Sequence, residues 1–358
     1  MGATENNLVA AIMAGGAGTR FWPLSTEEKP KQFIKIFDDR SLLQKSYDRV
    51  SGIIPDDRIL VLTSNRFVHL VREQLPMLPA QNVIGEPERK DTAAAVALGA
   101  VVAKKLFGNP VMSILTADHL IEPIEVFQKT LLSAAAAARE SGALYTFGIK
   151  PTYPASAYGY LETGEPTLND DGIEHFRLGS FKEKPDAKTA EHYLGTGRYL
   201  WNSGMFVWTV DSILGELERN VPNHVQQLSS AVESLGGAAW EEALAKSFSA
   251  LQKISIDFAV MEHAQDIRCV AGEFSWRDVG GWLAMTDFLS EDSSGNHTQG
   301  DLHALDSSGN LIYCEDPTET IALLGLSDIV VVRAGGKTLV ARKDRLEEVK
   351  KIVEGMGS

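Results

Sequence analysis

Residues 15–33 read GGAGTRFWPLSTEEKPKQF, and they follow directly on the apolar run LVAAIMA at positions 8–14. A glycine-rich turn after a buried first strand is typical of phosphate binding, because unhindered backbone N–H groups can converge on an anion. The stretch also carries two separated cations, Arg20 and Lys31. Arginine can bind two phosphate oxygens at once, whereas lysine is a mobile point charge. We therefore expect a polyphosphate site here; the simpler alternative is a surface loop with solvated charges.

Neither of the two familiar phosphate loops fits this stretch. A Rossmann loop needs G-x-G-x-x-G running into a helix. Phe21 stands in place of the third glycine, and Pro23 with residues 25–29 indicates an extended loop. The P-loop pattern G-x-x-x-x-G-K-[ST] is absent from the sequence. A triphosphate loop of another kind is therefore expected.

Length and composition restrict the class of protein. A chain of 358 residues suggests two domains, or one large domain with an appendage. The formal net charge is −14, so no sequence-wide attraction to nucleic acid or to an anionic membrane is expected. The first seven residues, MGATENN, are polar, and no apolar stretch is long enough to span a membrane. These features predict a cytoplasmic protein without a nucleic-acid or membrane partner.

Short apolar runs alternate with helical patterns over the first 150 residues, which predicts an α/β fold with a mainly parallel sheet flanked by helices. The expected strands are 8–14, 59–63, 82–85, 111–116 and 143–149, and the expected helices are 41–50, 67–75, 92–106 and 124–141.

The rest of the chain changes in character. Residues 158–205 indicate strands around one short helix, and residues 210–251 are mostly helical in pattern. A polar, turn-forming break follows at 290–301, and beyond it short strands end in a helical stretch. We expect one large domain over 1–289 and a small β domain with a closing helix over 290–358.

Five motifs, in order along the chain, resemble the sugar-phosphate nucleotidyltransferases, and among them the mannose-1-phosphate guanylyltransferases. They are the opening stretch 15–33, TADH at 116–119, FKEKP at 181–185, WNSGMF at 201–206 and WRDVGGW at 276–282. The resemblance implies a Rossmann-like, glycosyltransferase-A-like domain and a C-terminal β domain of β-helix type. It also implies transfer of GMP from GTP to mannose 1-phosphate, with pyrophosphate as the second product. Such a reaction demands alignment of two repelling anions and neutralisation of the developing charge.

The resemblance assigns the opening stretch to the triphosphate. The implied contacts are Gly15, Gly16, Gly18, Thr19 and Arg20. Lys31 is implied at the transferred phosphorus, and Arg20, Lys31 and Asp118 form the expected catalytic set.

Asp118 and Asp278 are the implied ligands of Mg²⁺. Asp118 follows the apolar run VMSIL, at the end of a parallel strand where such folds bind ligands. A carboxylate beside a nucleotide is repulsive unless it holds a cation, and oxygen ligands with phosphate favour Mg²⁺. The alternatives are that Asp118 caps a following helix and that Asp278 holds a turn. His119 is expected to pack or to hydrogen-bond rather than to act in catalysis.

The other implied contacts concern the sugar and the base. Gly159, Glu183, Lys184 and Asn202 are the implied sugar residues, although Glu183 and Lys184 alone would suggest an exposed charge pair at a strand end. Glu86 and Thr92 are the expected base contacts, since a carboxylate can accept hydrogen bonds from N1 and N2 of guanine but not from N1 of adenine. Here the sequence departs from the family, which more often has an Arg-Asn pair and a proline at positions 90, 91 and 94.

Two other functions stay open at this point: transfer to a different sugar phosphate or from a different nucleotide, and a non-catalytic regulator of the same fold that senses nucleotide sugars. A regulator would be expected to lose the charged site residues, yet all of them are present. The short exposed strands of the C-terminal domain are compatible with a homodimer contact.

Overall fold

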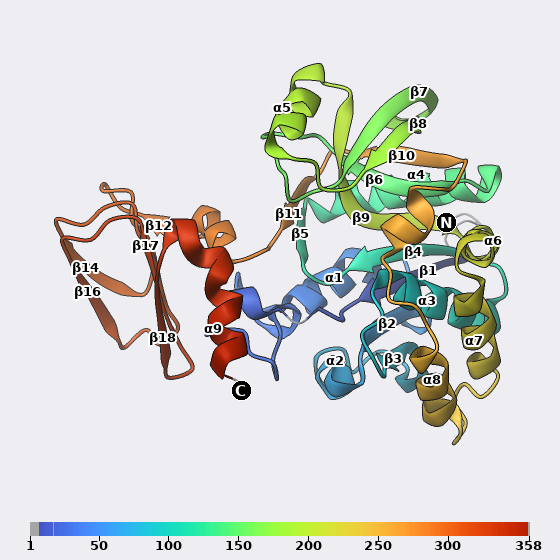
Figure 1. The fold of residues 1–358 in the computed structure, drawn as a ribbon, viewed down its shortest axis with the longest axis horizontal. Helices are drawn as coiled ribbons and strands as arrows, with labels where there is room; N and C mark the ends of the chain where they lie inside the picture. The colour runs from blue at the N-terminus through green and yellow to red at the C-terminus, as the bar shows by residue number, and fades with distance from the viewer. Residues whose placement is uncertain (1–6, 17, 357–358) are drawn as a thin grey trace. The chain divides into compact units, whose positions relative to one another are not determined.

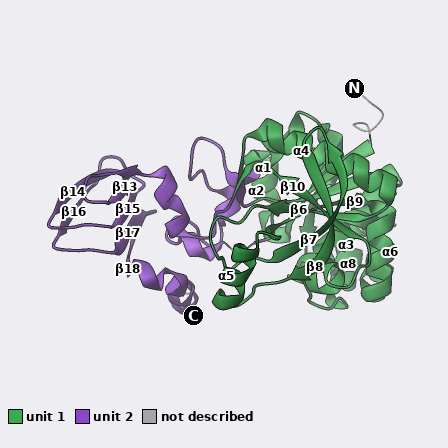
Figure 2. Cartoon of the chain, turned by 90° about the horizontal axis from the view of Figure 1, so that it is seen from above, with its two compact units in different colours: residues 1–15, 44–117, 121–276 green, residues 16–43, 118–120, 277–358 purple. Residues whose placement is uncertain are grey.

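The computed structural model describes residues 7–16 and 18–356, which form two compact units (Figure 2). Among the described residues, unit 1 contains those up to 15, 44–117 and 121–276, and unit 2 contains 16–43, 118–120 and 277–356. Unit 2 thus groups most of the glycine-rich loop with the C-terminal strands. The expected domain division at residue 289 stays a prediction, because compactness alone does not show which segment folds independently.

Unit 1 is built on a nine-stranded mixed sheet with the order β3-β2-β1-β4-β9-β6-β10-β8-β7 (Figure 1). Its strands are β1 (Leu8–Met13), β2 (Ile59–Ser64), β3 (Val83–Glu86), β4 (Val111–Thr116), β6 (Leu144–Ile149), β7 (Tyr160–Asp170), β8 (Ile173–Lys182), β9 (Tyr199–Thr209) and β10 (Ile267–Gly272). β1 is parallel to β2 and β4, and β6 is parallel to β10. β9 runs antiparallel between β4 and β6. The expected strands and the expected fold class are confirmed.

Helices cover both faces of this sheet. They are α1 (Leu42–Ser51), α2 (Val68–Gln74), α3 (Thr92–Phe107), α4 (Ile124–Ser141), α5 (Ala187–Thr196), α6 (Val210–Asn220), α7 (Pro222–Val232) and α8 (Trp240–Ser249). Leu144 of β6 packs in the same buried cluster as the alanines and valines of α3. Phe147, three residues further along β6, stacks on Phe127 of α4. Side chains an odd number of positions apart point to opposite faces of a strand, so α3 and α4 lie on opposite faces of the sheet. No helix among the described residues is both long and apolar enough to cross a membrane.

Unit 2 combines loops with short strands. Two small 3₁₀ turns, η2 (Thr19–Phe21) and η3 (Lys31–Phe33), lie in the glycine-rich segment, and among the described residues no α-helix begins before Leu42. This confirms the prediction that the glycine-rich segment is not a Rossmann loop, which would run directly into a helix. The pair β5 (His119–Glu122) and β11 (Ser275–Asp278) forms a separate two-stranded sheet, of which residues 119–120 and 277–278 belong to unit 2.

Most C-terminal strands stack in parallel ladders, as expected for a β-helix. They are β12 (Ser290–Glu291), β13 (His297–Gln299), β14 (Asp301–Leu305), β15 (Leu311–Cys314), β16 (Thr320–Leu324), β17 (Ile329–Ala334) and β18 (Lys337–Arg342). β13, β15 and β17 pair in parallel, and so do β14 and β16, whereas β12 pairs with β13 and β18 with β17 in antiparallel fashion. The 3₁₀ segment η9 (Lys343–Glu348) and helix α9 (Val349–Met356) close the chain, which confirms the expected closing helix.

One apolar core holds the glycine-rich segment to the C-terminal strands within unit 2. Phe21 and Trp22 of the loop share it with Trp282 and with Tyr313 and Val332 of the strands. The indole N–H of Trp282 donates to the Trp22 carbonyl oxygen at 3.0 Å, and its ring meets the ring of Phe21 edge-on with 5.2 Å between centroids. The loop is therefore anchored by side chains from the far end of the chain.

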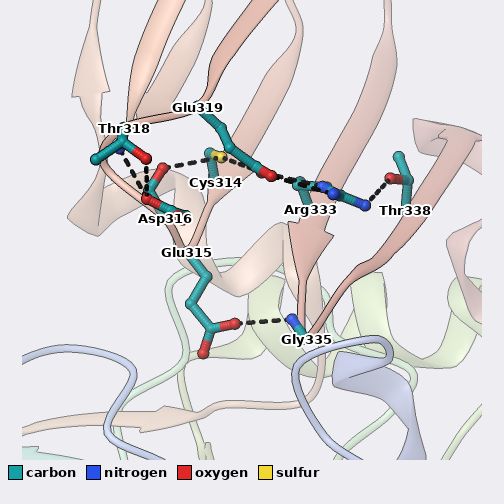
Figure 3. A network of polar contacts seen from close by, with 8 residues as sticks. All are labelled: Cys314, Glu315, Asp316, Thr318, Glu319, Arg333, Gly335 and Thr338. Carbon is teal, nitrogen blue, oxygen red and sulfur yellow. Dashed lines mark hydrogen bonds and ion pairs between the residues drawn. The ribbon is translucent and has the colours of Figure 1, made fainter.

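A polar network stiffens the turn between β15 and β16 (Figure 3). Arg333 donates two hydrogen bonds to Glu319, at 3.0 and 3.1 Å, in a bidentate pair. Asp316 accepts hydrogen bonds from the backbone N–H and the hydroxyl of Thr318. Bidentate arginine pairs have defined geometry, so this network fixes the path of the turn.

The shared core of unit 2 can be tested at Trp282, whose side chain is 1% exposed. We expect Trp282→Ala to lower the free energy of unfolding by about 3–5 kcal/mol, because it removes a large buried ring and leaves a cavity. Its neighbour Leu283 is 46% exposed, so Leu283→Ala is a matched control. Urea titration followed by circular dichroism measures both variants, and equal effects would contradict the anchoring role of Trp282.

Candidate active site

The ammonium group of Lys31 lies between two carboxylates in unit 2. Its Nζ is 3.0 Å from Oδ2 of Asp118 and 3.8 Å from Oδ1 of Asp278, and it donates a hydrogen bond of 2.9 Å to the carbonyl oxygen of Val279. The Lys31 side chain is only 12% exposed. Three residues that the sequence assigned to catalysis and metal binding are therefore brought together at one point.

Local structure explains how the two aspartates reach this point. Asp118 stands between the end of β4 and the start of β5, and Asp278 is the last residue of β11. A strand follows Asp118, so the alternative of a helix cap is wrong. Asp278 ends a strand that pairs with β5, and its carbonyl oxygen accepts a hydrogen bond of 2.7 Å from the Gly280 N–H, so a tight turn begins at this residue. This pairing aligns the two segments that carry the carboxylates.

Asp118, His119 and Asp278 form a group that could hold a metal ion, since one ligand atom from each lies within 4.8 Å of the others. Two carboxylates and an imidazole suit a divalent cation, and the oxygen donors suit Mg²⁺. His119 was placed outside the site by sequence reasoning. Its position directly after Asp118, an expected metal ligand, was the signal that could have included it.

The electrostatics of Asp118 agree with a site built for cations. Burial pushes the pKa of the Asp118 carboxyl up, but the charge and hydrogen bond of Lys31 and the charge of His119 outweigh it, so this pKa is lowered. Asp118 therefore stays ionised at neutral pH.

The glycine-rich loop is held in a fixed shape against the lysine segment. Gly18 has a φ of +62°, and a Cβ atom there would lie 2.5 Å from the backbone nitrogen of Lys31. Only glycine fits this backbone conformation and this close approach. Gln32 donates from Nε2 to the Gly16 carbonyl oxygen at 3.0 Å, and the Ser25 hydroxyl donates to the Gly18 carbonyl oxygen at 2.5 Å.

The two other residues assigned to the triphosphate by sequence lie on the same loop. Thr19 and Arg20 belong to η2, and Arg20 is exposed. Nη1 of Arg20 is 3.5 Å from the Gly280 carbonyl oxygen. Its guanidinium therefore remains largely available to an anion.

The predicted sugar residues meet in unit 1. Glu183 follows the end of β8, Asn202 lies on β9, and Gly159 precedes β7. The Asn202 N–H donates to the Gly159 carbonyl oxygen at 2.8 Å. A Cβ atom on Gly159 would lie 2.6 Å from Oε2 of Glu183, so a glycine is needed for this side chain to enter.

Glu183 and Lys184 differ in their surroundings. Nζ of Lys184 is 2.6 Å from Oε1 of Glu183, but the lysine side chain is 63% exposed and that of the glutamate only 14%. The alternative of an exposed charge pair thus applies to Lys184 and not to Glu183. The structure also brings Asp257 to this cluster, which sequence reasoning missed; its signal was one acidic residue within the apolar run of residues 256–261.

The predicted base residues have unequal environments. Burial raises the pKa of the Glu86 carboxyl to about 8. A Cβ atom on Gly15 would meet Oε2 of Glu86 at 3.4 Å, so this carboxylate lies over the end of the first strand. Thr92, in contrast, begins α3, and its hydroxyl accepts a hydrogen bond from the Ile256 N–H at 2.8 Å.

The residues that depart from the family pattern are occupied in structural contacts. Asp91 accepts a hydrogen bond from the Thr92 N–H at the start of α3. The carbonyl oxygen of Lys90 accepts from the Ile254 N–H at 3.3 Å.

Comparison with known proteins places this geometry in a family. Residues 9–294 match the family model described as nucleotidyl transferase, and residues 300–356 match the mannose-phosphate isomerase/GMP-like β-helix domain. A mannose-1-phosphate guanylyltransferase of Escherichia coli is 35% identical over 353 residues, which are 97% of this chain and 75% of that protein. The chain belongs to the mannose-1-phosphate guanylyltransferase family. The family suggested by the sequence motifs is thereby confirmed.

One further relative and two solved structures are also similar to this chain. The xanthan biosynthesis protein XanB of Xanthomonas campestris pv. campestris (strain B100) is 37% identical over 357 residues, 99% of this chain and 74% of that protein. A structure from Thermus thermophilus, described as a mannose-1-phosphate geranyltransferase, superposes with a TM-score of 0.85 at 32% identity. The match covers 98% of this chain and 100% of the Thermus chain. A Helicobacter pylori structure described as a mannose-6-phosphate isomerase has a TM-score of 0.61 at 27% identity. The match covers 76% of this chain and 100% of the Helicobacter chain.

The contacts of Lys31 in this guanylyltransferase family member generate a stability prediction. Lys31→Met keeps the length of the side chain but removes the charge that separates two carboxylates. We expect the free energy of unfolding to fall by about 1–3 kcal/mol, and added Mg²⁺ to restore most of it by neutralising the same carboxylates. Urea titration with and without Mg²⁺ measures both effects.

The exposed Lys35 supplies the control, since Lys35→Met removes the same charge at the surface. It is expected to change the unfolding free energy by less than about 0.5 kcal/mol. An unchanged urea midpoint for Lys31→Met, or an equal Mg²⁺ effect in wild type and variant, would argue against this arrangement.

Proposed function

We propose that this chain transfers GMP from GTP to α-D-mannose 1-phosphate, giving GDP-mannose and pyrophosphate. The observation that carries the proposal is the placement of Lys31 between Asp118 and Asp278, in a member of the mannose-1-phosphate guanylyltransferase family. A non-catalytic regulator has no need for a cation held against two carboxylates beside a glycine-rich loop.

The reaction needs alignment and charge neutralisation rather than a covalent intermediate. A phosphate oxygen of the sugar phosphate forms a new bond to the α-phosphorus of GTP. The bond from that phosphorus to the pyrophosphate oxygen breaks on the opposite side, and the electron pair leaves with pyrophosphate. Negative charge crowds around the α-phosphorus, so fixed cations at that position lower the barrier.

The glycine-rich loop supplies the contacts to the triphosphate. The backbone of Gly15, Gly16, Gly18 and Thr19 offers N–H groups to the phosphate oxygens, and exposed Arg20 binds two oxygens at once. Lys31 is the catalytic cation that neutralises charge on the α-phosphorus and the incoming sugar phosphate. Its single ammonium group on a flexible stem can exchange a carboxylate for a phosphate oxygen.

Asp118 and Asp278 are the proposed ligands of Mg²⁺, with His119 as a third donor close by. When bound, Mg²⁺ polarises the phosphate oxygens and shields their charge from the carboxylates. Asp118 suits this role because it is already ionised at neutral pH.

Unit 1 supplies the proposed contacts to the sugar and the base. Glu183 and Asn202 bind sugar hydroxyls, Gly159 contributes its backbone, and the exposed Lys184 binds the sugar phosphate. Glu86 accepts hydrogen bonds from N1 and N2 of guanine. A contact from Thr92 to the base stays a prediction, as do the cytoplasmic location and the homodimer.

The proposed reaction is tested by pyrophosphate release from the purified protein with Mg²⁺. We expect release with GTP and mannose 1-phosphate, and not with ATP, UTP or CTP or with glucose 1-phosphate in place of mannose 1-phosphate. Asp118→Asn is expected to lower the rate at least about 100-fold while the fold persists, because the metal and Lys31 lose a partner. Glu122→Gln, at an exposed position on β5, is the matched control.

Each outcome of that panel has a different meaning. Activity with another nucleotide or sugar phosphate would refute the substrates and retain the reaction. If the folded protein, supplied with Mg²⁺, releases no pyrophosphate with any of the substrates, the result would favour a non-catalytic regulator.

The raised pKa of Glu86 predicts a pH dependence of GTP binding. Only the ionised carboxylate can accept two hydrogen bonds from guanine, and the pKa of about 8 leaves Glu86 mostly protonated at neutral pH. The KM for GTP should therefore fall about tenfold or more when the pH rises from about 6.5 to about 8.5. Steady-state kinetics at both pH values measure this change.

Two comparisons make the pH prediction specific to Glu86. Glu86→Gln should show a high KM for GTP at both pH values, because its amide cannot ionise. The KM for mannose 1-phosphate serves as the internal control. A KM for GTP that is the same at both pH values in the wild type would contradict a base contact by Glu86.

A further inference from the structure

We propose that Asp257 is a further specificity-determining residue, whose carboxylate accepts a hydrogen bond from a hydroxyl group of the sugar 1-phosphate. The inference rests on the proposed function, because it adds a contact to the same sugar-binding cluster in unit 1.

Asp257 is placed in this cluster by its contact with Asn202. Nδ2 of Asn202 donates a hydrogen bond of 3.3 Å to Oδ1 of Asp257. Within residues 7–16 and 18–356, no other side chain hydrogen-bonds to the Asp257 carboxylate. A carboxylate has about four acceptor positions, so this one retains capacity for a ligand.

The bonds of Asn202 show why the cluster needs a second carboxylate. Its Oδ1 already accepts from the Thr146 hydroxyl at 3.0 Å and from the Gly204 N–H at 3.1 Å. The amide therefore presents only N–H groups to a sugar. Sugar hydroxyls that donate hydrogen bonds need acceptors, and the carboxylates of Glu183 and Asp257 provide them.

Asp257 is held in place by segments unrelated to the sugar cluster. It begins a short π-helix, η7 (Asp257–Met261). The residues before it are fixed to the start of α3, since Ile254 N–H donates to the Lys90 carbonyl oxygen and Ile256 N–H donates to the Thr92 hydroxyl. Short π-helical segments occur often at functional sites, where they direct a side chain into an unusual position.

The environment of this carboxylate is unfavourable without a ligand. Burial and the negative charge of Glu183 raise the pKa of Asp257 to about 6. Lys184 pairs with Glu183 and offsets part of this repulsion, yet the pKa of Asp257 stays raised, and acidic groups with raised pKa values concentrate at functional sites.

A purely structural role for Asp257 would be to orient the amide of Asn202. The structure argues against it, because Thr146 and Gly204 already fix that orientation from the other side of the amide. We therefore assign Asp257 a direct contact with the sugar.

The test compares wild type with Asp257→Asn on mannose 1-phosphate and on its 2-, 3-, 4- and 6-deoxy analogues, with GTP and Mg²⁺ held constant. Pyrophosphate release gives kcat/KM for each pair. We expect the variant to lose about 10- to 100-fold on mannose 1-phosphate, the usual cost of removing a hydrogen bond to a charged group. With one of the analogues, wild type and variant should differ by less than about threefold, because the hydroxyl that Asp257 binds is already missing.

Controls separate this contact from general damage. Glu262→Gln makes the same carboxylate-to-amide change at an exposed position one residue beyond η7. It should leave kcat/KM on mannose 1-phosphate and on each deoxy analogue as in wild type. The KM for GTP should be unchanged in Asp257→Asn, and its circular dichroism spectrum and melting temperature should show a folded protein.

The remaining outcomes overturn the assignment in distinguishable ways. An equal loss on mannose 1-phosphate and on all four analogues would show that Asp257 acts through the fold or through Asn202. No loss on mannose 1-phosphate would show that Asp257 contacts no sugar. A wild type without turnover on mannose 1-phosphate would overturn the proposed function itself, and the assignment with it.

Discussion

The contact of one ammonium group with two carboxylates joins three segments of unit 2. Lys31, Asp118 and Asp278 come from three segments that are far apart in the chain, and the two aspartates would repel each other without a cation between them. The pairing of β5 with β11 and the close approach of Gly18 to Lys31 both serve this contact. A site that already balances one positive against two negative charges is suited to exchange these partners for a metal ion and a phosphate chain.

Two acidic groups of unit 1 differ from Asp118 and Asp278 of unit 2 in having no cation bound to them among the described residues. Glu86 and Asp257 are acidic groups whose pKa values are raised by burial to about 8 and about 6, and within the described part of the chain neither has a cation hydrogen-bonded to it. We propose both as acceptors for N–H or O–H groups of a ligand. Recognition through such groups is selective, because a ligand that lacks the matching donor leaves a partly buried acceptor unpaired.

Much of this organisation could be predicted from the sequence, and the exceptions share a cause. The apolar runs of β1 and β4 are local signals, and both strands were predicted at the right place. The charged motifs at Lys31 and Asp118 are local signals too, and the structure brings these two residues together. The local signal at Asp257, one acidic residue in an apolar run, does not show its role, because that role depends on which side of the Asn202 amide is already bonded. The end of a strand at Asp278 depends on pairing with β5, about 160 residues away. The union of the glycine-rich loop with the C-terminal strands likewise depends on contacts between distant side chains.

The apolar core of unit 2 has a consequence for how such proteins can evolve. Phe21 and Trp22 anchor the glycine-rich loop by packing against Trp282, Tyr313 and Val332, which belong to the other end of the chain. A substitution in the loop that enlarges or shrinks one of these side chains requires a compensating change near the C-terminus. The C-terminal strands are therefore not an interchangeable module that recombination could replace freely, and the two ends of the gene should vary together among relatives.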